Sequence, residues 1–199
     1  MPRSGRAWYH QIWSTYASWL PGDPRGFRNR GHRLHSSGDY KNPPPPGEHA
    51  RLHAQNRQRH PKAIEVEHDL RQSLAASLIE LTRLLDARLN VVSVADKHPH
   101  LLIELEEDWD AMMTTCGLLR TYGSRAMRHT LPGRLWSGGH SPKRIKDVTH
   151  QRNTFRYIAE RQEEGAFVWA YTDPLPPLPV PLDDLLPRKR WRIDAEDEA

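Results

Sequence analysis

The sequence has one cysteine, Cys116, among its 199 residues. A single thiol forms no internal disulfide and cannot supply a cysteine-rich zinc module. No run approaches the roughly 18 consecutive apolar residues of a membrane-spanning helix, and the N-terminal segment lacks the apolar centre of a signal peptide. We therefore expect a protein of a reducing compartment, the cytoplasm, with no membrane partner.

Apolar residues are also scarce, at 37% of the chain with a mean hydropathy of −0.81, so part of the chain must stay outside a core. The net charge is +4, although the last six residues, Asp194 to Ala199, carry four acids. The rest of the chain is thus more basic than the total suggests. Such a surplus favours binding to a polyanion such as nucleic acid, while a basic protein without such a partner is the alternative.

The apolar pattern predicts a first strand over Trp8–Leu20, two strands over 90–95 and 98–105, a short strand within 134–145 and a last strand over 166–171. Apolar residues at steps of three and four predict helices over about 65–88, 108–129 and 147–164. Residues 95 and 98 are too close for a crossover, so their two strands are antiparallel. This order predicts an α+β fold, a ferredoxin-like antiparallel sheet with the helices packed on one face.

The domain is expected to span residues 1–171 and to contain an irregular basic insert at about 21–62, where arginine, histidine, glycine and proline replace the periodic apolar signal. Residues 172–199 form a tail that is first proline-rich, then basic and finally acidic. We expect its proline-rich part, 174–187, to be extended.

Two histidines, His98 and His100, open the strand over 98–105. Side chains two residues apart on a strand share one face, and neutral imidazole nitrogens are ordinary ligands of divalent metal ions. The pair is therefore half of a metal site, or else two surface histidines at the end of a hairpin.

Several segments together resemble a known family. They are His98-x-His100 before an apolar run, TYGSRAM at 121–127, LW before a glycine-rich turn at 135–139, RYI at 156–158 before GAFV at 165–168, and YHQIWSTYASWLPGDPRGF at 9–27. This set is similar to the HUH single-tyrosine transposases, and within them to the REP-associated tyrosine transposases. The resemblance covers roughly residues 8–24 and 90–169.

The resemblance implies that the chain cleaves and rejoins single-stranded or hairpin DNA through a 5′-phosphotyrosine intermediate, as a monomer or a homodimer. By position, Tyr157 matches the nucleophile and His98 and His100 match the paired ligands of Mg²⁺ or Mn²⁺. A phenol with a pKa near 10 is a poor nucleophile at neutral pH, so a nearby metal ion and basic groups would favour the phenolate. Tyr122 is a less favoured candidate for the nucleophile.

Two positions depart from the family pattern. Pro99, between the histidines, replaces a bulky apolar residue and donates no hydrogen bond to a strand ladder. The third metal ligand of the family lies about one helical turn after the tyrosine, but this chain has Arg161 there. Glu160, three residues after the tyrosine, is the better placed ligand, while Gln162 is turned away unless the helix end unwinds.

Other residues are expected to contact the DNA. The basic candidates for phosphate contacts are Arg125, Arg128, Lys143, Arg144 and Lys146, although a solvated basic surface is the alternative. Trp136 and the N-terminal tryptophans are candidates to stack on unpaired bases or to pack in the core. Two rival functions stay open, a domesticated nucleic-acid-binding protein of the same fold that no longer cuts, and a metal-dependent hydrolase without a covalent intermediate.

Overall fold

The structure is a computed structural model, which describes residues 1–27, 34–39, 41–139, 142–181 and 184. Its elements, in chain order, are β1 (Arg6–Ile12), α1 (Ala50–Arg59), α2 (His68–Leu84), β2 (Leu89–Val94), β3 (Pro99–Glu106), α3 (Trp109–Ala126), β4 (Lys143–Arg144), α4 (Val148–Glu160) and β5 (Phe167–Ala170).

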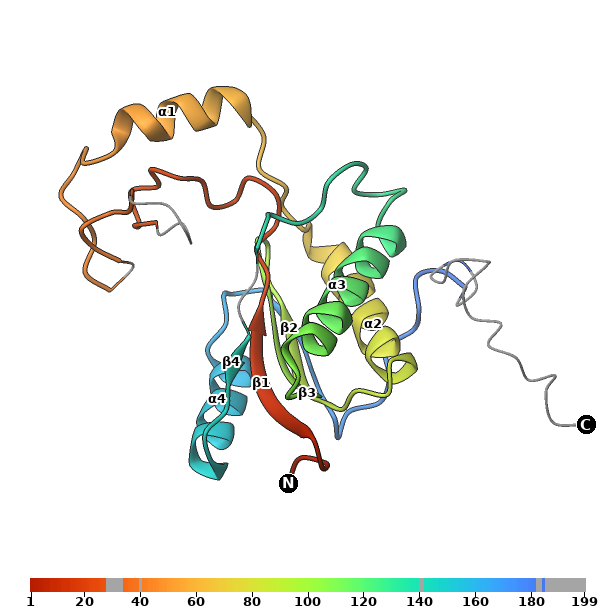
Figure 1. Cartoon of the computed structure of the whole chain (residues 1–199). Coiled ribbons are helices and arrows are strands. Elements are labelled where there is room, and N and C mark those ends of the chain that lie inside the picture. Colours follow the sequence, from red (N-terminus) through yellow and green to blue (C-terminus); the bar gives the residue numbers. More distant parts are fainter. Residues whose placement is uncertain (28–33, 40, 140–141, 182–183, 185–199) are drawn as a thin grey trace, which may run out of the picture.

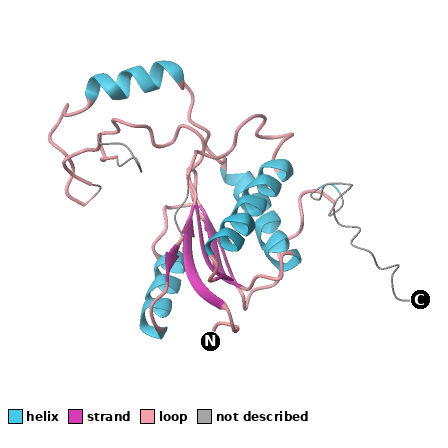
Figure 2. Ribbon diagram, in the orientation of Figure 1, coloured by secondary structure: helices cyan, strands magenta, loops and turns pink. Residues whose placement is uncertain are grey.

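The strands form one antiparallel sheet (Figure 2). Their order across the sheet is β4-β1-β3-β2-β5. The predicted α+β class is therefore confirmed. Strand β1 is shorter than expected, since it ends at Ile12, and the chain then follows the start of β3 as a loop. Two backbone amides of this loop form hydrogen bonds with the start of β3 and the turn before it. Trp13 N–H donates to Pro99 O at 3.4 Å, and Thr15 N–H donates to Lys97 O at 2.8 Å.

Helices α2 and α3 cover one face of the sheet (Figure 1). Three leucines of α2 at steps of four and three, Leu74, Leu78 and Leu81, are fully buried there. They pack in one core with the residues of β3 that point to this side, such as Leu101 and Ile103. Burial of this apolar stripe supplies the main driving force for folding.

Helix α4 lies on the opposite face, so the expectation that all helices pack on one face is wrong (Figure 1). Its Ile158 is fully buried against Val91 of β2 and Leu102 of β3, in a second small core that includes Trp8. The physical reason is that β3 is apolar on both faces, which is typical of a strand covered on both sides. Because α4 covers only part of this face, it leaves the end nearest the start of β3 accessible.

Helix α1 stands apart from the sheet, within the segment 21–62 that was expected to be irregular (Figure 1). None of its residues is buried. It is joined to the rest by polar contacts, among them Asn56 Nδ2–H donating to Pro21 O at 3.1 Å and the Tyr16 hydroxyl at 2.6 Å from His60 Nδ1. The helix thus presents most of its surface to solvent, including the exposed Arg51 and Arg59 and the partly exposed Arg57.

The start of the predicted tail returns to the domain, since Trp169 Nε1–H donates to Pro174 O at 3.1 Å and Val180 packs against the larger core. The basic cluster at 188–192 and the acidic end lie outside the described residues. Within the described part of the chain, no helix is long and apolar enough to cross a membrane.

Candidate functional site

A pocket of about 680 Å³ lies on the α4 side of the sheet, where β1 ends and β3 begins. The side chains that line it come from β1 and the loop that follows it, from the start of β3 and the turn before it, from β4, and from α4 and the segment after it. The lining residues include His10, His98, His100, Lys143, Tyr157 and Glu163. The fold therefore brings side chains as far apart in the sequence as His10 and Glu163 to one cavity.

His100 is the most buried histidine of the pocket, with 3% of its surface exposed. Its Nδ1 lies 3.0 Å from Nε2 of His10 on the neighbouring strand β1, and the two rings stack. Its Nε2 is buried and has no hydrogen-bond partner among the described residues. A buried nitrogen without a partner is costly, and a ligand in the pocket would satisfy it.

Burial also lowers the pKa values of the His10 and His100 imidazoles. It lowers the pKa of His10 from 6.5 to about 4, assisted by Lys143 and His150. It lowers the pKa of His100 to about 3, assisted by His98 and His10. Both rings are therefore neutral near pH 7, which is the state that binds metal ions.

Tyr157 reaches the same pocket from α4. The helix begins with a side-chain cap, in which Asp147 accepts a hydrogen bond from His150 N–H at 2.7 Å. Ile158 faces the sheet, so the adjacent Tyr157 lies on the flank of the helix and is 43% exposed. Its ring meets the rings of His10 and His100 edge-on, with centroids 6.0 and 5.6 Å apart.

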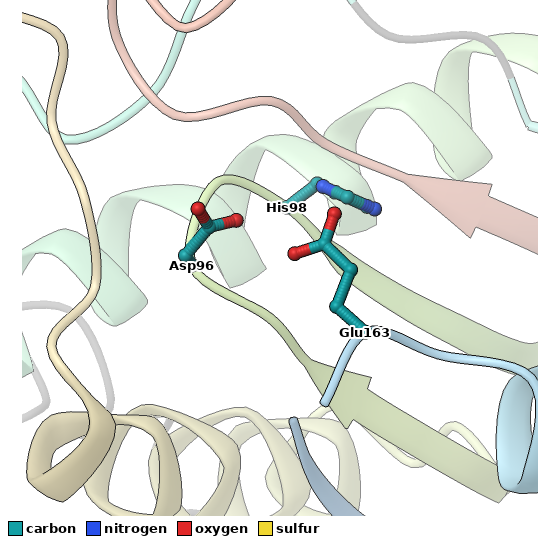
Figure 3. Close-up of side chains that lie close together, drawn as sticks. All are labelled: Asp96, His98 and Glu163. Atoms are coloured by element: carbon teal, nitrogen blue, oxygen red, sulfur yellow. The ribbon is translucent and has the colours of Figure 1, made fainter. Parts of the chain in front are cut away.

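A second group of possible ligands surrounds His98, which precedes β3. Its ring lies 4.9 Å from that of His100 between centroids. Asp96 and Glu163 each place a carboxylate oxygen near it, and one ligand atom from each of the three residues lies within 4.8 Å of the others (Figure 3). Carboxylate oxygens and imidazole nitrogens are both common ligands of divalent metal ions, and this set does not single out one metal.

The two carboxyl groups differ in acidity. Burial and the neighbouring Asp96 raise the pKa of Glu163. Burial acts in the same direction on Asp96, but the Lys97 ammonium, 2.8 Å from Asp96 Oδ2, together with Glu163 and His98, outweighs burial and lowers the pKa of Asp96. Two acids this close repel each other when both are ionised, and a bound cation would relieve that repulsion.

Glu160, the third ligand expected from the sequence, is the last residue of α4, is exposed, and is not among the described residues that line the pocket. The helix ends there rather than at residue 164. The chain then turns and carries Glu163 to His98, while Gln162 Nε2–H donates to the carbonyl oxygen of Tyr157 at 2.9 Å. The position of the helix end thus decides which acid reaches the site.

Pro99 does not break the strand. It is the first residue of β3 and pairs with Val94 of β2, a position at which a proline is tolerated. His98 therefore lies in the turn before the strand, and its ring approaches His100 from there.

The basic residues proposed from the sequence separate in space. Lys143 of β4 lines the pocket, and Arg144 beside it forms an ion pair with Glu107. Lys146 is exposed in the loop before α4. Arg125 lies over the ring of Tyr122 at the end of α3, and the exposed Arg128 follows it, so both belong to the opposite side of the sheet.

The aromatic candidates separate too. Tyr122 is 5% exposed in the larger core. Trp13 and Trp136 pack against each other there, and Trp8 is buried in the smaller core. Trp19 is the exception, since it lines the pocket and is 41% exposed.

Sequence reasoning missed His10 and Glu163, and it named Trp19 only together with the other N-terminal tryptophans. The alternation along β1 placed His10 on the face of Trp8 and Ile12, but its contact with His100 depends on the register between β1 and β3.

The chain was compared with models of known protein families, with curated proteins and with solved structures, and none of them matches it.

Proposed function

We propose that the chain is a metal-dependent nuclease and strand transferase that cuts single-stranded or hairpin DNA through Tyr157, in the cytoplasm, as a monomer or homodimer. One observation carries the proposal. A half-exposed tyrosine lies edge-on to the neutral imidazoles of His10 and His100, in a cavity that also holds carboxylates and a lysine. A tyrosine needed only for packing would not require these neighbours.

In this proposal the Tyr157 oxygen attacks the phosphorus of a phosphodiester. A bond between Oη and phosphorus forms while the bond from phosphorus to the 3′ oxygen breaks. The phenol proton passes to solvent, and the released 3′ oxygen takes up a proton. The 5′ phosphate is left on Tyr157. A 3′ hydroxyl that loses its proton and attacks this phosphorus breaks the bond from phosphorus to Oη, so the strand is rejoined and the Tyr157 oxygen takes up a proton.

The residues fit a divalent cation. The unpartnered Nε2 of His100 and the grouped ligand atoms of Asp96, His98 and Glu163 are the available donors. We propose that His98 and His100 hold Mg²⁺ or Mn²⁺ and that Glu163 takes the place proposed for Glu160. Such an ion would polarise the scissile phosphate and favour the phenolate.

Positive side chains around the pocket support a phosphate-bearing substrate. Lys97 and Lys143 line it from two sides, and Arg25 lines it from the loop after β1. Cations in a partly enclosed cavity concentrate a polyanion and offset its charge.

The proposal is tested by cleavage of labelled hairpin oligonucleotides with Mg²⁺ or Mn²⁺. His98→Ala and His100→Ala should each abolish metal-dependent cleavage and leave most DNA binding, because other residues contact the phosphates. His129→Ala, at an exposed position after α3, is the control for loss of a histidine. Cleavage retained by both site variants would place the metal elsewhere.

The same assay separates the two rivals. A protein that binds the hairpin and never cuts it would be the domesticated binding module. A protein that cuts without leaving a protein-linked strand would be a hydrolase that uses water.

A further inference from the structure

Trp19 is a large aromatic residue that the fold leaves open. It is 41% exposed, whereas the other tryptophans before residue 100, Trp8 and Trp13, are at most 6% exposed. It lines the same pocket as Tyr157 and His100, on the side formed by the loop after β1. An exposed indole beside a candidate reaction centre calls for an explanation other than core packing.

The indole is held in place by its own loop. Its Nε1–H donates to Gly26 O at 2.7 Å, and the guanidinium carbon of Arg25 lies 4.3 Å from the ring centroid. Arg25 is itself fixed, since its Nε and Nη2 donate to the two carboxylate oxygens of Asp23 at 2.8 and 2.7 Å. Asp23 is 5% exposed, so the Arg25 side chain that lies over Trp19 is bound to a buried carboxylate.

The loop backbone is shaped for this arrangement. Gly26 has φ of +97°, and a Cβ there would come within 2.8 Å of Gly38 O. Only glycine combines that conformation with so close an approach. The Trp19 side chain is therefore already ordered in the folded protein, so ligand binding does not have to reduce its conformational entropy.

A fixed, half-exposed indole suits the flat surface of a nucleobase. Base stacking on aromatic side chains is the main sequence-tolerant interaction with single strands, and cations beside the ring hold the adjoining phosphates. A base within a duplex already has both faces stacked, so only an unpaired base is available. A hairpin whose stem is base-paired up to the scissile phosphate would therefore offer no base to this indole.

We propose that Trp19 is the stacking platform for one unpaired base of the DNA strand, next to the phosphate presented to Tyr157. The inference rests on the proposed function for the identity of the ligand. It adds a base subsite to the pocket and assigns Arg25 and Asp23 to holding that subsite in shape.

The test measures binding in the Tyr157→Phe background without metal, so that no strand is cut. Fluorescence anisotropy follows a labelled single-stranded oligonucleotide and a series in which each nucleotide in turn is abasic. The protein with Trp19 should lose about 5- to 150-fold in affinity when one particular base is removed. Trp19→Ala should bind the intact strand more weakly by a similar factor and should no longer respond to that abasic position.

Two variants control for damage to the fold. Trp19→Phe keeps an aromatic face and should restore most of the affinity and the abasic penalty. Trp109→Ala removes a 50%-exposed tryptophan at the start of α3, beyond the far end of β3, and should change nothing.

The proposal is overturned if Trp19→Ala binds the intact strand as tightly as its parent, if it keeps the same abasic penalty, or if the parent binds no single strand. These outcomes are independent of the covalent chemistry. A protein-linked strand on Tyr157 without any Trp19 dependence would refute the base subsite and leave the proposed function standing, while Trp19-dependent binding without a covalent link would do the reverse.

Discussion

Acidification from about pH 7.5 to about pH 5 should destabilise the fold through its buried histidines. The pKa of His10 falls from 6.5 to about 4 on burial, and that of His100 falls to about 3. A group whose folded pKa is lowered binds its proton more readily in the unfolded chain. Stability is therefore lost as the pH falls below 6.5, and the loss ends only near the folded pKa values.

The size of the effect follows from the distance between the assay pH and the unfolded pKa. At about pH 5, each imidazole favours the unfolded chain by about 2 kcal/mol, or roughly 4 kcal/mol for the pair, since one pKa unit is worth about 1.4 kcal/mol. That is a large part of the roughly 5–15 kcal/mol that stabilises a typical domain. Glu104, whose pKa is lowered to about 2 by Arg88 and Arg3 against the opposing effect of burial, loses its contribution only below its normal pKa of 4.5.

Urea unfolding at the two pH values measures this loss. With a slope of about 2 kcal/mol per molar urea, the midpoint should fall by roughly 2 M. His10→Gln and His100→Gln should each remove about 2 kcal/mol of the pH dependence, and His129→Gln is the matched control. Equal unfolding midpoints at both pH values would refute the claim that these imidazoles are buried and neutral.

Other consequences of the structure can be tested separately. Glu104→Gln should lower the free energy of unfolding by about 2–3 kcal/mol, because it leaves two guanidinium groups without their buried carboxylate. The control Glu106→Gln, at a partly exposed position, should lower it by less than about 1 kcal/mol, and urea titration of both variants measures the difference. Glu163→Gln should weaken Mn²⁺ binding by about tenfold or more, and Glu160→Gln should not; calorimetry would contradict this if the two were equal. Replacing the three arginines of α1 by glutamine should lower the salt slope of single-strand binding by up to about 2, at roughly 0.7 per lost phosphate contact; an unchanged slope would exclude α1 from the interface.

Local sequence patterns were enough for most of the fold. The alternation and the short corner near residue 96 predicted the antiparallel strands, and the leucine steps predicted α2. They did not predict the layers, because a helix with one apolar stripe carries no information about which face of the sheet it covers. The apolar character of both faces of β3 contained that information, since Leu102 and Leu101 point in opposite directions and both are fully buried.

The site was less accessible from sequence. The spacing of His98 and His100 and the resemblance around Tyr157 named residues that the fold places in one pocket. The neighbours that complete the pocket depend on non-local geometry. His10 reaches His100 only through the register of β1 on β3, and Glu163 reaches His98 only because α4 ends early.

The central claim is that Tyr157 forms a covalent link to DNA. The most direct measurement is to incubate the protein with a labelled hairpin oligonucleotide and Mn²⁺, denature and digest it, and locate any nucleotide-bearing peptide by mass spectrometry. The account predicts a 5′-phosphate on Tyr157 and no adduct in Tyr157→Phe, whose folding and DNA binding should be close to those of the parent. An adduct of equal yield in Tyr157→Phe, or a strand cut with no adduct on any residue, would contradict it.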